Sequence, residues 1–471
     1  MKIFYSKQTA FILFLIFALS VFGNAQNKDL VISERNVRAH LEFLASDAMQ
    51  GRGSGTQFEQ ISAYYFASMM QQFGIEPAGQ KDLSGKTTYI QEVNIVRNSF
   101  ADIPKLVYFA NGVNAALEHG KEMIILRMSS AAVSGGLQKM VLGEKPKDGA
   151  IVFIKSSGDA PVSMQVLQTL TASGAAAVIV EENAQWRTNW IRFASRKVSS
   201  ISTSDKIEKT AALIVVSKDE AVKIAQLSDG TNFEIKGELS SPQKQQTWNA
   251  VGKITGSDAS LSPEVILLSA HLDHLGVRPN APGDDKLFNG ADDDASGCVA
   301  VLELARVLVV GKKPKRTVYF AFYGSEEAGG YGAQYFADNL EFPKDKLVAN
   351  LQFEMIGRPD AKVKPGELWL TGYERSNLGP ELAKQGANLV ADPHPEENFF
   401  QRSDNYTLAR QGIVAHTVSS FGLHKDYHQA SDEIKTIDFN HLTRSINSMV
   451  KPIEWLVNSN FKPVWNEGKK P

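Results

Sequence analysis

Residues 265–273 read VILLSAHLD, an apolar run that ends in a histidine and an aspartate. The run is continuous rather than alternating, which is typical of a strand that is buried on both faces of a sheet. Similar runs lie at residues 318–323, 347–353 and 413–418, and residues 296–310 have the spacing of an amphipathic helix. Strands that alternate with helices predict an α/β fold with a mainly parallel sheet sandwiched by helices.

Residues 101–245 have a different character from the rest of the chain. Short β-rich runs, such as the one at residues 175–180, are joined there by connections rich in Gly, Ser and Lys. We therefore expect an inserted β-rich module that interrupts a discontinuous main domain. The main domain would comprise residues 26–100 and 246–460, and residues 461–471 would form a C-terminal tail.

The first 25 residues have the pattern of a secretory signal peptide. A short basic segment precedes an almost wholly apolar run at residues 10–22, and Gly23 and Ala25 place small residues just before the expected cleavage site. The apolar run is shorter than the roughly 20 residues that span a bilayer, so cleavage is favoured over a membrane anchor. We expect export to a periplasmic or extracellular location, without a stable membrane anchor.

The composition of the 471 residues narrows the classes of function. The chain has 50 basic and 52 acidic residues, so no bulk field attracts nucleic acid. The hydrophobic fraction of 43% is too high for a disordered chain and too low for a multi-span membrane protein. One cysteine, Cys298, excludes an intramolecular disulfide and a cysteine-rich zinc site, and we expect it to be a small buried residue. Any bound metal therefore needs histidine or carboxylate ligands.

Histidines and carboxylates gather directly after the apolar runs. His271 and Asp273 follow the first run, and side chains two apart in an extended chain point to the same side. Asp273 can therefore accept a hydrogen bond from the ring nitrogen of His271 that does not hold a metal. His274 follows on the opposite side, and we interpret it as a loop or packing histidine.

Three adjacent acids, Asp292, Asp293 and Asp294, precede the expected helix at residues 296–310. A negative charge at this position is favoured by the helix dipole, and one acid is enough to cap the helix. Three acids repel one another unless a cation compensates their charge. A metal that bridges the acids is the better explanation of the surplus.

Further candidate ligands follow the later strands. Glu326 and Glu327 come after the second apolar run, and because adjacent side chains diverge, one can hold a metal while the other acts as general base. Glu354 ends the third run, and His424 and His428 come later in the chain. Ligands bind at the carboxyl ends of strands in open α/β sheets. Such a mixed set suits two divalent ions, zinc first, with manganese or cobalt as substitutes.

The ordered motifs resemble those of the M28 family of zinc metallopeptidases, which are mostly aminopeptidases. They read HLDHLG at 271–276, GADDDASG at 290–297, SEEAGG at 325–330, EMIGR at 354–358 and DYH at 426–428. The resemblance covers nearly all of the expected mature chain except the insert, and it implies the phosphorylase/hydrolase-like fold of zinc peptidases. The insert at residues 101–245 is similar, in its position and its AVIV strand, to a protease-associated (PA) domain.

The resemblance implies a role for each residue of the first motifs. His271 would bind one zinc ion, with Asp273 as the residue that orients its ring. Glu354 would bind the same zinc ion, although the family often has Asp at this position. Asp293 would bridge both zinc ions, and its peptide bond to Asp294 is expected to be cis.

The remaining motifs imply the other half of the site. His428 and Glu327 would bind the second zinc ion, and His428 is favoured over His424 because Asp432 follows it four residues later. Glu326 would be the general base, which takes a proton from the zinc-bound water and passes it to the leaving amine, so that zinc-bound hydroxide is the nucleophile.

The function expected from the resemblance is that of an exported di-zinc exopeptidase that removes N-terminal residues from peptides. The alternatives are a glutaminyl-cyclase-like enzyme with one zinc, a carboxypeptidase or dipeptidase of the same fold, and a non-catalytic receptor-like relative. Asn405 stands where the family often has His, in a segment that shapes the substrate pocket, so side-chain specificity is left open. A serine hydrolase fits poorly, because the chain has no G-x-S-x-G elbow.

Overall fold

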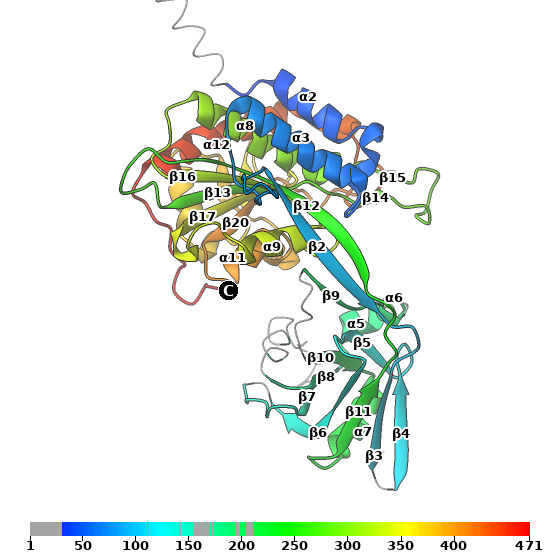
Figure 1. Ribbon diagram of the computed structural model, residues 1–471. Helices are drawn as coiled ribbons and strands as arrows, with labels where there is room; N and C mark the ends of the chain where they lie inside the picture. The colour runs from blue at the N-terminus through cyan, green and yellow to red at the C-terminus, as the bar shows by residue number, and fades with distance from the viewer. Residues whose placement is uncertain are drawn as a thin grey trace, which may run out of the picture. The chain divides into compact units, whose positions relative to one another are not determined.

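The structure of the protein is a computed structural model (Figure 1). It describes residues 31–471 except for residues 111, 142, 155–166, 168, 169, 171–173, 195–197 and 204–210. The signal peptide expected at residues 1–25 lies outside the described residues, and export therefore stays a prediction. Among the helices described, we find none that combines the length and the apolar character needed to cross a membrane. The chain forms two compact units, Met1–Val93 with Gln246–Pro471, and Asn94–Gln245.

A mixed β-sheet forms the centre of the first unit. Its strands, in spatial order, are β19 (Leu389–Ala391), β18 (Leu368–Leu370), β20 (Ala415–Ser419), β17 (Leu347–Phe353), β13 (Val265–His271), β16 (Thr317–Tyr323), β12 (Gln243–Ile254) and β2 (Ile90–Ser99). The four strands from β20 to β16 are parallel to their neighbours, whereas β18 and β12 join them in antiparallel fashion. The fold is α/β as expected, but the sheet is parallel only at its centre and mixed towards its edges.

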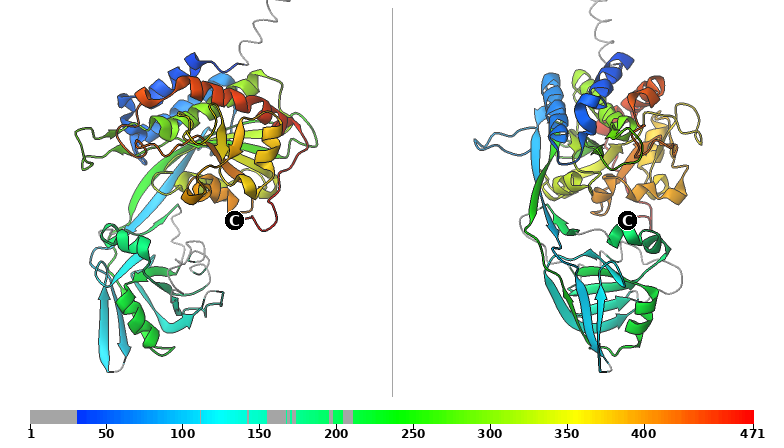
Figure 2. Two further views of the ribbon diagram at one scale, coloured as in Figure 1. Left: turned by 180° about the vertical axis from the view of Figure 1, so that it is seen from behind. Right: turned by 90° about the vertical axis from the view of Figure 1, so that its right-hand side faces the viewer.

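Helices cover both faces of this sheet (Figures 1 and 2). One face carries α2 (Glu34–Leu44), α3 (Gln57–Phe73), α8 (Gly297–Val310) and α12 (Phe439–Asn458), with α10 (Leu378–Lys384) against α12, and the other carries α9 (Tyr331–Asp338) and α11 (Asn405–Ala409). Short helical turns lie at Asp47–Arg52, Lys344–Lys346, Tyr373–Arg375, Pro395–Glu397, Phe399–Gln401 and Ile434–Thr436. Two short strands, β14 (Gly276–Val277) and β15 (Leu287–Phe288), form a separate hairpin, and β1 (Glu76–Pro77) pairs with β12.

The continuous apolar run in β13 is explained by the two layers of helices. Ile266, Leu268 and Ala270 pack into the core under α8, whereas Val265 and Leu267 pack into the core on the opposite face. Because successive side chains of a strand point to opposite faces, a strand covered on both sides needs apolar residues at every position. His271 at the end of β13 is the first ionisable residue of the run.

The second unit has its own eight-stranded sheet. Its strands, in spatial order, are β4 (Val113–Glu118), β3 (Lys105–Ala110), β11 (Asn232–Lys236), β6 (Ala132–Met140), β7 (Ile151–Ile154), β8 (Ala177–Glu181), β10 (Ala212–Val216) and β5 (Met123–Arg127). Its described helices are α5 (Ala184–Thr188), α6 (Trp190–Ala194) and α7 (Lys218–Gln226), and β9 (Val198–Ser202) pairs with the end of β2. The unit begins at Asn94 rather than at residue 101, because the last residues of β2, which pair with β9, belong to it.

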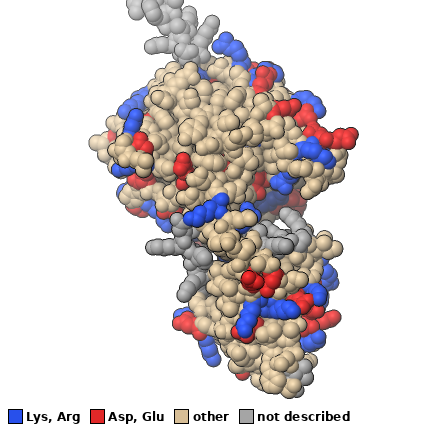
Figure 3. Space-filling model, turned by 45° about the vertical axis from the view of Figure 1, so that its right-hand side comes forward, with Lys and Arg blue, Asp and Glu red and all other residues tan. Residues whose placement is uncertain are grey.

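Charged side chains of both signs are interspersed on the face of the molecule shown in Figure 3. This agrees with the formal net charge of −2. The carboxylates that dominate the chemistry of the chain are instead buried in the first unit.

Candidate metal centre

The candidate site lies at the carboxyl ends of the parallel strands in the first unit. The predicted site residues follow these strands: His271 and Asp273 after β13, Asp293 before α8, Glu326 and Glu327 after β16, Glu354 after β17 and His428 after β20. Carboxyl ends of parallel strands meet at one edge of a sheet, so topology alone brings these residues together.

Asp293 is at the centre of the cluster and is 2% exposed. Its Oδ1 lies 3.1 Å from Nε2 of His271, and its Oδ2 lies 3.3 Å from Nε2 of His428. The two oxygens of one carboxylate thus face two different histidines. The peptide bond between Asp293 and Asp294 is cis, which confirms the expectation drawn from the motif. The arrangement is that of a carboxylate able to bridge two cations.

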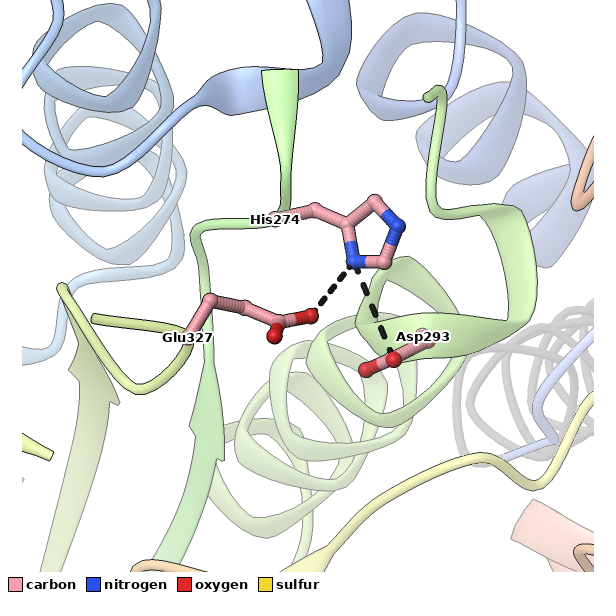
Figure 4. Close-up of side chains that lie close together, drawn as sticks. All are labelled: His274, Asp293 and Glu327. Carbon is pink, nitrogen blue, oxygen red and sulfur yellow. Dashed lines mark ion pairs between the residues drawn. The ribbon is translucent and has the colours of Figure 1, made fainter. Parts of the chain in front are cut away.

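His274 belongs to the cluster, although sequence reasoning assigned it to a loop or to packing. Its Nδ1 lies 2.8 Å from Oε1 of Glu327 and 3.7 Å from Oδ2 of Asp293 (Figure 4). One ligand atom from each of these three residues lies within 4.8 Å of the other two. The strand ends at His271, so the alternation of faces no longer applies three residues later, and the backbone turns His274 back into the site.

Glu327 and His428 complete this side of the cluster. Oε2 of Glu327 lies 3.2 Å from Nε2 of His428, whose side chain is 37% exposed. His424, the competing candidate, instead places its Nε2 2.9 Å from Oδ2 of Asp292. The structure therefore brings His428, and not His424, to the centre of the cluster.

The polar atoms at the centre of the cluster fit a cation. Among the described residues, Nε2 of His274 is buried without a hydrogen-bond partner, and Nε2 of His271, Nδ1 of His274 and Oε1 of Glu327 face charged neighbours at 2.8–3.1 Å without a hydrogen bond of good geometry. Buried polar atoms without partners cost free energy unless another group, such as a metal, satisfies them. Imidazole nitrogens and carboxylate oxygens are the ligands that zinc takes in the absence of cysteine. The donor set of this site thus fits the metal implied by the motifs.

Burial and the charges of neighbouring residues shift the pKa values of the acids in the site. Burial raises the pKa of Glu354 to about 7, and Asp293 nearby adds to the shift while His271 opposes it. Burial also raises the pKa of Glu326 well above its usual value, and Glu354 adds to this shift. Burial alone would raise the pKa of Asp293 as well, but His271 and His428 outweigh it and hold this pKa well below the usual range. The cluster is thus an excess of acid that a bound cation would neutralise.

Asp273 has a wider role than orienting His271. Its Oδ1 accepts a hydrogen bond from the backbone N–H of Glu326 at 3.0 Å, and its Oδ2 accepts one from the N–H of Glu327 at 3.3 Å. Nδ1 of His271 lies 3.2 Å from the backbone oxygen of Asp273 and 3.8 Å from Oδ1. The carboxylate therefore positions the Glu326–Glu327 turn, and the backbone oxygen is the atom nearer to the imidazole.

Two buried charged residues near the N-terminus support the site, and sequence reasoning missed both. Arg52 is 1% exposed and donates hydrogen bonds to four backbone carbonyl groups, which include those of Leu272 and Gly290. Glu59 is fully buried and accepts from the N–H of Ser325 at 2.8 Å. Backbone carbonyl groups occur at every residue, so an arginine that donates only to them is not part of a sequence motif and could not be found from one.

A network around Arg358 joins the loops that carry Asp293 and His428. The Arg358 guanidinium lies 3.4 Å from Oδ2 of Asp292, 2.8 Å from Oδ2 of Asp426 and 3.3 Å from Oδ1 of Asp432. The Asp432 carboxylate in turn accepts from the backbone N–H of Asp293 at 3.1 Å. One guanidinium thus links three acids on two loops, and these loops carry Asp293 and His428.

Two pockets adjoin the cluster from different sides. The first is a hollow beside Glu354, which we call the aromatic pocket; its lining residues are Glu354, Met355, Trp369, Thr371, Phe399, Arg402, Ser403, Thr417, Ser419, Phe421 and Tyr427. The second lies beside His274 and Glu327 and is also lined by Arg278. A ligand at the cluster can therefore extend in two directions, and one of them is lined by aromatic rings.

Comparison with known proteins agrees with this geometry. Residues 249–451 match the sequence model of peptidase family M28. A probable lipoprotein aminopeptidase of Mycobacterium tuberculosis is 24% identical over 297 residues, which are 61% of this chain and 56% of that protein. An aminopeptidase of Pseudomonas aeruginosa is 29% identical over 199 residues, 42% of this chain and 33% of that protein. The chain thus spans little more than half of the first relative and a third of the second.

Solved structures share the fold. An aminopeptidase from Aneurinibacillus sp. strain AM-1 superimposes with a TM-score of 0.51 at 16% identity and covers 91% of this chain and 95% of its own. A zinc aminopeptidase from Bacillus subtilis gives a TM-score of 0.50 at 17% identity, with 92% and 97% covered. The family match spans all the candidate ligands from His271 to His428. Residues 249–451 of this chain are therefore similar to peptidase family M28.

Proposed function

We propose that this protein is an exported di-zinc aminopeptidase that hydrolyses single residues from the N-termini of peptides. The observation that carries the proposal is the position of Asp293, whose two carboxylate oxygens face His271 on one side and His428 on the other. The relatives and structural neighbours named as aminopeptidases, one of them as a zinc enzyme, support it. Ligands on both sides of Asp293 argue against a single-zinc cyclase and against a receptor-like relative without metals.

Each half of the site would hold one zinc ion. His271 and Glu354 would supply one half, and His428 and Glu327 the other, with Asp293 shared between them. Nδ1 of His274, 2.8 Å from Glu327, would either join the second half as a ligand or hold the Glu327 carboxylate in place. Zinc ions bound here would polarise the scissile carbonyl group and lower the pKa of the attacking water.

Glu326 is the residue that we assign to proton transfer. Its backbone N–H donates a hydrogen bond to Oδ1 of Asp273, and it stands beside Glu327. Burial raises its pKa, which favours a carboxylate that accepts a proton and returns it in the same reaction cycle. Glu326 would take the proton of the attacking water and deliver it to the leaving amine.

The two pockets suggest how a peptide would lie across the site. The aromatic pocket beside Glu354 would receive the side chain of the N-terminal residue, because the rings of Trp369, Phe399 and Phe421 favour apolar side chains. The free α-ammonium group would lie among the acids of the cluster. The following residues would then extend past His274 and Glu327 into the second pocket.

A substrate panel tests the proposal. The full chain is assayed with aminoacyl p-nitroanilides and with the same anilides after N-acetylation, before and after treatment with a chelator. We expect cleavage of the free substrates only, loss of activity on chelation, and recovery when zinc is restored. Equal cleavage of blocked and free substrates would overturn the aminopeptidase assignment.

Export and the nature of the second unit are parts of the same proposal. Export rests on the pattern of residues 1–25, and sequencing the N-terminus of the protein from the cell envelope or medium tests it. A mature chain that begins at Gln26 is expected, and a retained leader would contradict it. The assignment of Asn94–Gln245 to a PA-like domain rests on its position in the chain and on its strand pattern.

A further inference from the structure

Trp369 is the most buried of the aromatic side chains that line the aromatic pocket. It lies on β18 and is 1% exposed, against 8% for Phe399 and 5% for Phe421 in the same lining. Phe399 stacks on its indole ring, with ring centroids 5.4 Å apart and planes inclined by 22°. The indole and the Phe399 ring therefore form one stacked wall of the pocket.

A buried carboxylate anchors this indole from behind. Oδ2 of Asp360 accepts a hydrogen bond from Nε1–H of Trp369 at 3.1 Å and lies 2.8 Å from Nε2 of His394. Oδ1 of Asp360 accepts from the backbone N–H of Lys362 at 2.8 Å. Asp360 and His394 are 3% and 2% exposed. Hydrogen bonds to an ionised acceptor are stronger than neutral ones, so this contact fixes both the position and the rotation of the ring.

His394 has a feature that simple packing does not explain. Among the described residues, its buried Nδ1 has no hydrogen-bond partner, while the rings of Trp369 and Phe399 pack edge-on against it at centroid distances of 6.4 and 6.1 Å. An unpartnered polar atom in an aromatic cluster costs free energy that an apolar residue would avoid. Polar groups kept in such a core can specify one arrangement of their neighbours. Here the neighbour that is held in place is the wall of a pocket.

We propose that Asp360 and His394 are positioning residues that fix Trp369 as a wall of the aromatic pocket, and thereby set the size of the N-terminal side chain that the enzyme accepts. The inference rests on the proposed aminopeptidase function, because it assigns the pocket to that side chain. Leucine and phenylalanine side chains would reach the indole, whereas an alanine side chain would not. Loss of the anchor should therefore affect large substrates more than small ones.

The ratio of kcat/KM for leucyl and alanyl p-nitroanilide is the first measurement. In Asp360→Asn, which keeps the shape and removes the charge, and in Trp369→Phe, which removes the indole N–H, we expect this ratio to fall by about tenfold, the size typical of a change in an apolar pocket. The effect should lie mainly in KM for the large substrate. An unchanged ratio in both variants of an active enzyme would overturn the inference.

Two comparisons separate positioning from general destabilisation. His394→Gln keeps an N–H that can reach Asp360 and should retain more of the ratio than His394→Ala. Tyr65→Phe is the matched control, because it removes another buried histidine contact, 2.6 Å between the Tyr65 hydroxyl and Nδ1 of His40, on helices away from the pocket. We expect Tyr65→Phe to lower the melting temperature and to leave the ratio unchanged. A ratio that follows the melting temperature across all variants would refute positioning.

The indole N–H itself gives a measurement that does not depend on activity. The chain has six tryptophans, so a ¹⁵N-tryptophan-labelled sample gives few indole signals, and the one lost in Trp369→Phe is that of Trp369. This signal should move in Asp360→Asn and stay in place in Tyr65→Phe. If the zinc-loaded protein cleaves no aminoacyl substrate, the proposed function fails, yet the signal still tests the anchor. If the Trp369 signal does not move in Asp360→Asn, Asp360 does not anchor the indole, whatever the activity of the variant.

Discussion

The two halves of the proposed metal centre are built in different ways. His271 ends a central strand, is fully buried, and has its backbone N–H held by Asp294 at 3.2 Å. His428 lies on a loop with a φ of +55°, has a side chain that is 37% exposed, and stacks on Tyr427 with ring centroids 3.9 Å apart. One half is thus fixed by the sheet itself. The other depends on contacts between loops, and we expect it to be the weaker half.

The largest effect on activity is expected at Glu326, where a substitution should greatly slow the reaction without removing metal from either half. Glu326→Gln keeps the size of the side chain and removes the carboxylate that we assign to proton transfer. We expect kcat to fall by roughly 10²–10⁴-fold, the usual contribution of general acid–base catalysis. Bound zinc, measured by elemental analysis of the purified protein, should stay at the wild-type level. A variant that keeps its turnover would remove Glu326 from this role.

The next prediction tests the comparison of the two halves directly. His271→Ala and His428→Ala each remove one imidazole, and both should lower zinc affinity, measured by competition with a chromogenic chelator. We expect His271→Ala to lower the melting temperature as well, because it leaves a cavity at the end of a central strand. His428→Ala should change the melting temperature little, since its side chain is partly exposed. Equal losses of stability would contradict the distinction between strand and loop.

The Arg358 network should matter for the loop-built half. Arg358→Met keeps the length of the side chain but leaves three acids, Asp292, Asp426 and Asp432, without their shared cation. We expect zinc affinity to fall by about 10–100-fold, which is typical when a residue that supports metal ligands is removed. The effect should appear as loss of one zinc ion before the other in a chelator titration.

A second buried arginine serves as the control for this prediction. Arg316 is fully buried and lies 2.9 Å from Oε2 of Glu264, at the opposite end of β13 and β16 from the cluster. Arg316→Met should lower the melting temperature without selective loss of zinc. If both variants lose zinc to the same extent, the Arg358 network supports the fold in general rather than the metal site.

Much of the site could be predicted from the sequence because its residues lie in short motifs at the ends of strands. His271, Asp293 and Glu327 occupy such positions, and parallel topology brings them to one edge without further information. His274 was missed because its direction depends on a turn that begins where the strand ends. A periodic pattern is informative only as long as the periodic element continues.

The contacts that support the site are harder to predict from sequence. Arg52 contacts the carbonyl group of Gly290, and Asp360 contacts His394, so each pair is far apart in the chain and belongs to no common motif. The direction of strands β12 and β18 was also hard to predict. Their antiparallel pairing depends on the side from which the chain re-enters the sheet. Local patterns of apolar residues do not indicate the direction in which a strand joins the sheet.

The smallest effect is expected at Cys298, in the strand-built half. The thiol is 1% exposed, which confirms the expectation of a small buried residue, and it donates to the backbone carbonyl of His271 at 3.0 Å. Cys298→Ala removes this weak bond and a small volume, so we expect a loss of about 1 kcal/mol in the free energy of unfolding. For a unit of this size that corresponds to a shift of about 2–4 °C in Tm, measured by calorimetry. Zinc content and activity should stay at wild-type levels, because a strand fixed by both neighbours keeps His271 in place. Loss of zinc in this variant would show that the strand-built half is less rigid than its hydrogen bonds indicate.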